Sequence, residues 1–442
     1  MPAFDQRPAG HAYTCGLIEI FVKMVLSAIG YRASARALKI VACLLPGGDA
    51  PSANGGQLWL LRLGLYELRR PKEPADDWVW LVDHTIQTGN GKCLLVVGVR
   101  LSVWNASRLT ALGHDPQASF ALRHQDLSVF QIELMESCTG EAVERRLEQL
   151  ADQTGITPCA ILSDQGPDVR PGAQRFCQKA GGSTVLVHDV AHAVANGLKR
   201  TLQNDPQWAQ FLADANRSKT QIRQTVYAFL MPPELKNKSR WMNLEPLIAW
   251  SRRVKQFLCD PQAALARAGL HVDLETLQQK MGWLHRYEEA IDRWSTLLLA
   301  AAISLKYIRN HGYHERAHEE LGALLAGFRE GPTATLVEEI LQFVQTQGAA
   351  CGTRRLPGST EVLESLIGRG KQLMGRNKNG YTKTVLAMAA AVADVTSHTI
   401  QTALQMVKVQ DVQQWIDKEL GSSLQAQRQR ALAIPTRGTK TG

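Results

Sequence analysis

Residues 78–83 read Trp-Val-Trp-Leu-Val-Asp, and residues 159–164 read Cys-Ala-Ile-Leu-Ser-Asp. Each stretch is a short apolar run that ends in an aspartate, which is the pattern of a buried strand followed by an acidic side chain. A carboxylate in that setting costs desolvation free energy unless a cation or hydrogen bonds compensate it. An aspartate after a strand is also a common turn or helix-capping residue, so each acid taken alone fits a structural role equally well.

A third acidic residue lies on an expected helix. Residues 359–368 read Ser-Thr-Glu-Val-Leu-Glu-Ser-Leu-Ile-Gly, which is typical of the beginning of a helix and contains Glu364. Hard divalent cations prefer oxygen ligands, and two strand-end aspartates with a helix-borne glutamate can hold a pair of them. Asp83, Asp164 and Glu364 therefore predict a two-metal site for phosphoryl transfer on nucleic acid.

The segments around the two aspartates predict a mixed α/β core. Strands are expected at 78–83, 93–101 and 128–135, and Thr88-Gly-Asn-Gly91 is a strong signal for a hairpin turn between the first two. The pattern then predicts, in order, a helix at 140–153, the strand that ends at Asp164, a helix near 172–180, a strand at 185–187 and a helix at 190–203. This order of elements resembles a ribonuclease H-like core.

The N-terminal region predicts three short helices, at about 14–30, at about 33–44, and from a Ser52 cap to Leu68, with Gly30 ending the first. Turn residues between them and exposed Lys and Arg residues make the region resemble a helix-turn-helix unit, although a plain helical subdomain fits the same pattern. Residues 1–74 carry nine Lys/Arg and five Asp/Glu, a net charge of +4. The side chains expected to meet DNA are Arg32, Arg36, Lys39 and Arg62.

The whole chain is expected to have five parts. Residues 204–350 lack a strand pattern, and a long helical stretch is expected at about 381–420. The predicted parts are a helix-turn-helix-like domain with its linker at 1–74, the first part of the core at 75–203, a helical insertion at 204–352, the second part of the core with the Glu364 helix at 353–420, and a basic disordered tail at 421–442.

The charge of the chain favours a polyanionic partner. Its 442 residues carry a formal net charge of +9, and residues 351–385 have seven Lys/Arg against two Glu. Because this basic cluster surrounds Glu364, phosphate contact is a better explanation for it than a solvated face. The eight cysteines include no Cys-x-x-Cys pair, as expected for reduced thiols in a cytoplasmic protein. No apolar run is long enough to span a bilayer, so no membrane association is expected.

The spacing of the three acids makes the comparison with a known family more specific. Asp83, Asp164 and Glu364 lie 81 and 200 residues apart, which resembles the arrangement in DDE transposases of bacterial insertion sequences. The segment His188-Asp-Val-Ala-His192 resembles an Asp-x-x-His element of several transposase families. The segment Thr360-Glu-Val-Leu-Glu364-Ser, with Lys371 after it, resembles their Thr-Asn-x-x-Glu-Ser … Lys motif. Glu361 stands in place of the usual Asn, so whether Glu361 or Glu364 is the third acid is open.

This resemblance, which covers residues 75–200 and 355–400 best, implies a DNA transposase. Such an enzyme binds the ends of its element, cleaves the DNA and joins the 3′ ends to a target. The resemblance implies two Mg²⁺ or Mn²⁺ ions on the three acids, double-stranded DNA as partner, and a homodimer or larger assembly on that DNA. The alternatives are a ribonuclease H-like nuclease that only hydrolyses nucleic acid, and a domesticated transposase that binds DNA without catalysis. The residues expected to contact DNA near the site are Lys371, His192, Arg369, Arg376 and Lys378.

Several other residues have simpler interpretations. Asp168 lies in a turn, and Asp189 is placed to cap the helix that follows it. His311, His314 and His318 have a helical spacing that fits a metal site, but they lie among glutamates as on a solvated helix. The tryptophans of the insertion are expected to lie in its core, and stacking of one of them on a flipped base is the alternative. These residues are Trp241, Trp250, Trp283 and Trp294.

Overall fold

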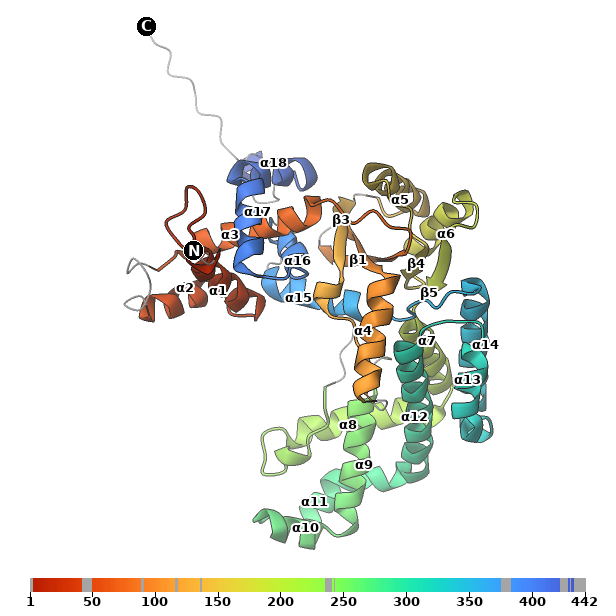
Figure 1. The fold of residues 1–442 in the computed structure, drawn as a ribbon. Coiled ribbons are helices and arrows are strands. Elements are labelled where there is room, and N and C mark those ends of the chain that lie inside the picture. The colour runs from red at the N-terminus through yellow and green to blue at the C-terminus, as the bar shows by residue number, and fades with distance from the viewer. Residues whose placement is uncertain are drawn as a thin grey trace. The chain divides into compact units, whose positions relative to one another are not determined.

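The structure, a computed structural model, describes residues 3–41, 50–88, 91–115, 118–135, 137–234, 241, 243–374, 383–421, 428–429 and 431–432. The chain forms two compact units, Met1–Val187 with Thr360–Gly442, and His188–Ser359 (Figure 1). The second unit is thus an insertion in the sequence of the first. Among the helices described, none has the length and apolar character that crossing a membrane requires.

The first unit is mixed α/β and contains a five-stranded sheet with the order β3-β2-β1-β4-β5. β2 pairs antiparallel with both β1 and β3, whereas β4 pairs parallel with β1. The strands lie where the sequence predicts them, although β1 continues five residues beyond Asp83. Their bounds are β1 Trp78–Thr88, β2 Gly91–Arg100, β3 Ser128–Met135, β4 Ala160–Ser163 and β5 Val185–His188.

The predicted hairpin is framed by the pairing of Thr88 with Gly91, and the two turn residues between them lie outside the described ranges. A helix that the sequence did not predict, α4 (Leu101–His114), follows β2 directly. The expected strand at 93–101 therefore ends one residue earlier, at Arg100. The side chain of Arg100 forms an ion pair with Asp77, whose other oxygen accepts the N–H of Ser102 at 2.9 Å. This pair fixes the sharp change from strand to helix.

Two helices, α5 (Gly140–Thr154) and α6 (Val169–Lys179), cover one face of the sheet. Trp80 is fully buried at the centre of this packing, with its ring centroid 5.5 Å from that of Phe130 on β3 and 6.1 Å from that of Phe176 on α6. Alternate residues of β1, including Trp78 and Val82, belong to the same cluster. The residues between them, Asp83 included, therefore face the other side of the sheet.

The N-terminal helices share a hydrophobic core with the C-terminal part of the chain. Leu17, Phe21 and Leu60 lie in one cluster with Ala390 and Leu404, so residues 1–74 are not the separate domain that the sequence predicts. The helical stretch expected at about 381–420 consists of several short helices. The helices concerned are η1 Ala3–Asp5, α1 Cys15–Leu26, α2 Tyr31–Ile40, α3 Ala53–Arg69, α15 Glu361–Met374, η9 Lys383–Val385, α16 Leu386–Ala390, α17 Ser397–Met406 and α18 Val409–Glu419.

The backbones of α3 and α16 approach each other closely in this core. A Cβ atom added to Gly64 would lie 2.1 Å from the carbonyl oxygen of Leu386, so only glycine allows the two backbones this approach. At the other end of α3, the Ser52 hydroxyl accepts the N–H of Gly55 at 3.0 Å, as the sequence predicts for its cap. Gly30 does not end the first helix, because it is the residue that precedes α2.

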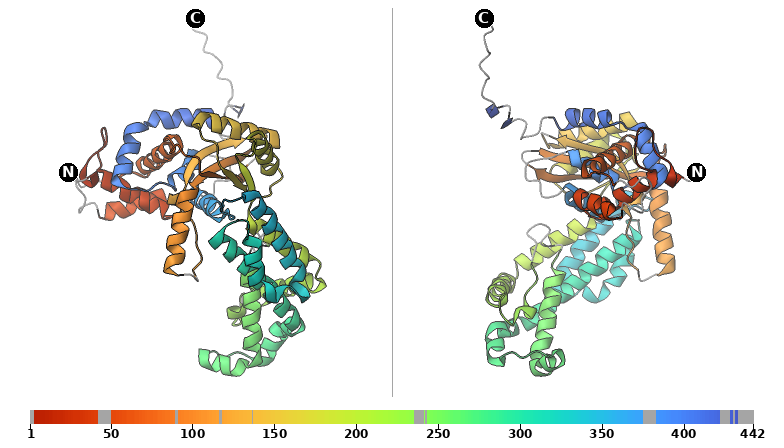
Figure 2. Two further views of the ribbon diagram at one scale, coloured as in Figure 1. Left: turned by 45° about the vertical axis from the view of Figure 1, so that its right-hand side comes forward. Right: turned by 90° about the vertical axis from the view of Figure 1, so that its left-hand side faces the viewer.

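The second unit is helical, as predicted for the insertion, and it begins at His188 rather than at residue 204. Figure 2 shows this unit, coloured from yellow-green to blue, as a set of helices. Phe211, Trp294 and Tyr287 pack together in its core. Its helices are α7 Val190–Gln203, α8 Pro206–Ile222, η4 Ala228–Leu230, α9 Glu245–Cys259, α10 Pro261–Ala268, α11 Leu274–Met281, η6 Gly282–Tyr287, α12 Glu288–His311, α13 Ala317–Leu324, η7 Ala326–Phe328, η8 Gly331–Thr333 and α14 Ala334–Cys351.

Candidate functional site: acidic residues at a sheet edge

The two aspartates occupy neighbouring positions of the sheet. The parallel register of β1 and β4 pairs Val82 with Ser163. The residue that follows Val82 is Asp83, and the residue that follows Ser163 is Asp164. Adjacent strands lie roughly 4.8 Å apart, and residues in register on parallel strands point to the same face. Both carboxylates are half-buried. Asp83 lies within β1 rather than at its end, at the point where the pairing with β4 stops and the pairing with β2 goes on.

The loop after β4 holds the Asp164 carboxylate in a defined position. Its Oδ1 atom accepts the N–H of Gly166 at 3.0 Å, and a Cβ atom at residue 166 would lie only 2.8 Å from the same oxygen. The other oxygen, Oδ2, makes no hydrogen bond to any residue in the described ranges. A carboxylate that is fixed through one oxygen and open at the other is suited to bind a cation.

Glu364 is carried by α15, which contacts β1. The backbone N–H of Glu364 donates to the Thr360 carbonyl at 3.0 Å, which sets the first turn of this helix. The neighbouring residues Leu363 and Leu366 are fully buried, whereas Glu361 and Glu364 are both half-buried and lie one turn apart. The first unit thus brings the helix with the third acid to the strand that carries Asp83, and the choice between Glu361 and Glu364 stays open.

The opposite face of β1 carries a cluster of titratable side chains that the sequence pattern did not predict. His84 is largely buried, with its Nδ1 atom 4.0 Å from Asp168, and Asp168 in turn binds Lys92. Burial lowers the pKa of His84, and the charge of Asp168 opposes that shift. Asp168 is therefore half of an ion pair with Lys92, which fits the structural role expected for it. The available signal was a histidine at a position where strand alternation calls for a core residue.

Two further predicted residues form a pair in the second unit. Asp189 is fully buried and caps α7, since its Oδ2 atom accepts the backbone N–H of His192 at 3.0 Å. The same oxygen lies 2.7 Å from Nδ1 of His192. This confirms the capping role predicted for Asp189 and shows that His192 contacts a carboxylate.

The basic residues of α2 form an exposed stripe. Arg32, Arg36 and Lys39 follow one another by four and three positions, so they share one face of the helix. Ser34 and Leu38 are buried on the other face. None of the three cations forms an ion pair with a residue in the described ranges. They remain available to an anionic partner.

Arg62 does not belong to that surface, which corrects the prediction from sequence. Only 7% of it is exposed, because its guanidinium donates to the carbonyls of Leu404 at 2.5 Å and Val407 at 2.6 Å and also contacts His11. The carbonyl groups at the end of a helix lack partners within the helix. Arg62 satisfies two of them at the end of α17, so its charge stabilises the fold.

The basic residues around α15 differ in their surroundings. Lys371 is exposed in the last turn of the helix. Arg369 is half-buried, donates to the Leu26 carbonyl, and lines a cleft with Lys23 and His124. Arg376 and Lys378 lie outside the described residues.

The spacing of the three histidines of the insertion would allow them to share one helix face. In the structure they do not share one. His311 is the last residue of α12, and His318 belongs to α13, which begins at Ala317. His314 lies in the connection between them, with its Nε2 atom 3.7 Å from Glu320.

The three acids fit a pair of hard cations by their chemistry, because all their donors are carboxylate oxygens. Models of known protein families do not match this chain, and no curated protein sequence is significantly similar to it. The function is therefore inferred from the residues of the chain itself.

Proposed function

We propose that this chain is a DNA transposase of the DDE class, which binds the ends of a mobile element, cleaves DNA and joins the freed 3′ ends to a target. One observation carries the proposal: the register of β1 and β4 gives Asp83 and Asp164 neighbouring positions at the point where their pairing stops. The helix with Glu364 contacts the same strand, β1, after an inserted helical unit.

The order of the elements supports a ribonuclease H-like core. Three antiparallel strands are followed by α5, β4, α6 and β5, and the two last strands lie on the far side of β1. In that superfamily the first acid lies on the first strand, the second just after the fourth strand, and the third on a later helix. Asp83, Asp164 and Glu364 follow the same order. Two aspartates in register on β1 and β4, with a glutamate-bearing helix that contacts β1, are hard to explain as a set of turn residues.

The cofactor of the proposed enzyme is a pair of Mg²⁺ or Mn²⁺ ions. Asp83, Asp164 and Glu364 would hold them, and when bound such a pair activates the attacking oxygen and stabilises the leaving oxygen of a phosphodiester. The protein contributes the positions of its carboxylates: β1 and β4 fix two of them, and the hydrogen bond from Gly166 orients Asp164.

The positive charge of the chain fits duplex DNA as its partner. The net charge is +9, and the stripe of Arg32, Arg36 and Lys39 is exposed without ion pairs to the described residues. Cations on one helix face can contact successive phosphates of a duplex. Joining two ends requires at least two active sites, so we expect a homodimer or larger assembly on DNA.

The double variant Arg32→Gln, Arg36→Gln is expected to weaken binding to duplex DNA that contains the element ends. The slope of log K against log salt should fall by about 0.9 for each phosphate contact that is lost. The matched control is Arg145→Gln, Arg170→Gln, which removes two exposed charges from α5 and α6. Fluorescence anisotropy at several salt concentrations measures both. Equal losses in the two variants would show that only total charge matters and that α2 is no specific DNA contact.

The proposed reaction is tested by incubating the protein with labelled end DNA, target plasmid and Mg²⁺ or Mn²⁺. We expect joined products in which the labelled 3′ end is linked to the target. Cleavage without joining would instead identify a nuclease that only hydrolyses DNA. End binding without cleavage would identify a DNA-binding protein that has lost catalysis.

A further inference from the structure

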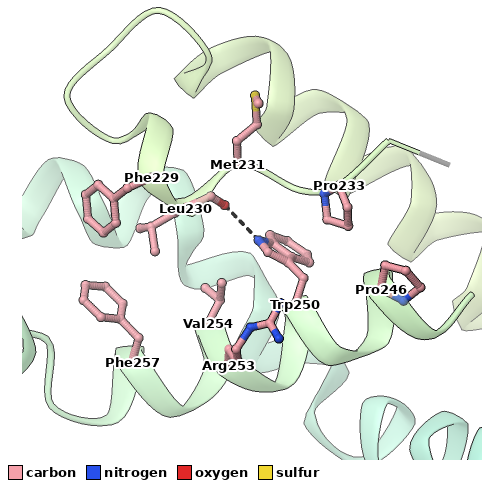
Figure 3. Close-up of a pocket in the computed structure, with 9 residues that line it drawn as sticks. All are labelled: Phe229, Leu230, Met231, Pro233, Pro246, Trp250, Arg253, Val254 and Phe257. Atoms are coloured by element: carbon pink, nitrogen blue, oxygen red, sulfur yellow. Dashed lines mark hydrogen bonds between the residues drawn. The ribbon is translucent and has the colours of Figure 1, made fainter. Parts of the chain in front are cut away.

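An open pocket in the second unit lies between η4 and α9 (Figure 3). Its volume is about 450 Å³, within the roughly 300–1,000 Å³ common for ligand sites. Trp250, Val254 and Leu230 are buried and form its floor, and Nε1 of Trp250 donates to the Leu230 carbonyl at 2.9 Å. This hydrogen bond fixes the indole ring, so the pocket has a rigid base.

One end of the pocket is aromatic. Phe229 and Phe257 face each other there edge to face, with ring centroids 5.9 Å apart and an interplanar angle of 81° (Figure 3). Phe229 is 46% exposed and Met231, also on the rim, is 41% exposed. Large apolar side chains that stay in water at the mouth of a pocket often mark a binding site. Flat aromatic ligands stack well on such rings.

The same helix carries positive charge beside the aromatic end. Arg253 lines this pocket and also a neighbouring one of about 510 Å³, to which Arg252 and Lys255 contribute. Lys255 is paired with Asp292 at 3.1 Å. Arg252 and Arg253 are exposed, and neither forms an ion pair with a residue in the described ranges. Two arginines without an ion pair among the described residues therefore remain, Arg253 in the aromatic pocket and Arg252 in the neighbouring one.

We infer that Phe229 of η4 and three residues of α9, Phe257, Arg252 and Arg253, bind unpaired nucleotides of a DNA strand. A base stacks on the phenyl rings while the arginines contact the adjoining phosphates, which is how proteins hold single strands without sequence preference. A paired duplex does not offer the flat face of a base, and an apolar peptide leaves the two arginines uncompensated. The inference deepens the proposed function and rests on DNA as its substrate.

The test measures single-strand binding by the full chain without divalent metal. Fluorescence anisotropy with an oligodeoxythymidine strand should show Phe229→Ala to bind about 5- to 150-fold more weakly, the range for loss of one base–aromatic stack. Arg253→Gln should lower the slope of log K against log salt by about 0.7, as expected for one phosphate contact on a single strand. Leu324→Ala and Arg267→Gln remove an exposed apolar and an exposed basic side chain elsewhere in the unit and serve as matched controls.

A photocrosslink locates the bound strand. An oligonucleotide with 5-iododeoxyuridine should crosslink to residues 226–234 or 245–259, and the crosslink should be lost in Phe229→Ala. The inference would be overturned if both test variants bound the strand as tightly as their controls. A crosslink elsewhere in the chain would also overturn it. So would a pocket that binds an apolar peptide and no single strand. Because metal and catalysis are absent from these measurements, a failure here leaves the acidic site untouched, and an inactive acidic site leaves this result unaffected.

Discussion

Asp83→Asn is expected to abolish DNA cleavage while leaving the binding of end DNA within a few-fold of wild type. The substitution keeps the shape of the side chain but removes a negative charge from the proposed metal site. Loss of a residue that only hydrogen-bonds a metal ligand typically lowers metal affinity or activity by about 10- to 100-fold. Loss of a metal ligand itself should therefore lower the cleavage rate by about 100-fold or more. Cleavage of labelled end DNA with Mn²⁺, together with an anisotropy titration, measures the two properties.

The matched control for this experiment is Asp152→Asn, which removes the charge of an exposed aspartate on α5. Its cleavage rate should equal that of wild type. Asp164→Asn should behave as Asp83→Asn does, and a comparison of Glu361→Gln with Glu364→Gln decides which glutamate is the third acid. Cleavage retained by purified Asp83→Asn protein would remove Asp83 from the site and with it the main support for a transposase.

Gly64→Ala is expected to destabilise the first unit strongly. Its added Cβ atom would lie 2.1 Å from the Leu386 carbonyl oxygen, and backbone atoms cannot move aside as the end of a side chain can. Overpacking of a well-ordered core typically costs about 1–3 kcal/mol, and this exceeds the gain of roughly 0.5–1 kcal/mol that alanine gives over glycine inside a helix. Urea unfolding, followed by circular dichroism, measures the free energy of unfolding.

Gly113→Ala is the matched control, because Gly113 is also a helical glycine and has open space around its missing Cβ. It should gain stability where Gly64→Ala loses it. A gain in both variants would mean that α3 and α16 are not in close contact and that the N-terminal helices form a domain of their own. The shared core has a practical consequence: deletion of residues 1–70 would expose the apolar surface of α16 and α17, so charge substitutions on α2 are the better test of DNA binding.

Much of the sheet could be predicted because its signals are local. The apolar runs before Asp83 and Asp164, and the periodic helices after them, place β1, β4, α5 and α7 correctly. The extension of β1 through its polar end could not be predicted, since pairing with β2 holds it there. The helix α4 was missed because Trp104 is its only buried residue, so that no apolar period shows in the sequence.

The candidate site also has parts that the sequence could predict and parts that it could not. The two aspartates after apolar runs follow from a local pattern, and their neighbouring positions follow from the parallel pairing of β1 with β4. The burial of Arg62 could not be foreseen, because the carbonyls that bind its guanidinium come from α17, more than 300 residues farther along the chain. An arginine on an apolar helix looks the same in sequence whether it meets solvent, phosphate or a distant helix end.

The sharing of one core by the first and last helices also affects synthesis on the ribosome. Leu17, Phe21 and Leu60 pack in one cluster with residues 387–404, so their packing is complete only when that segment has been made. At about 5–20 residues per second, the ribosome needs roughly 15–60 s to travel from the end of α3 to the start of α16. During that interval the apolar surface of the first three helices that α16 and α17 cover stays open to water. The nascent chain is therefore expected to depend on chaperones until its final segment emerges, and proteins truncated near the C-terminus should aggregate.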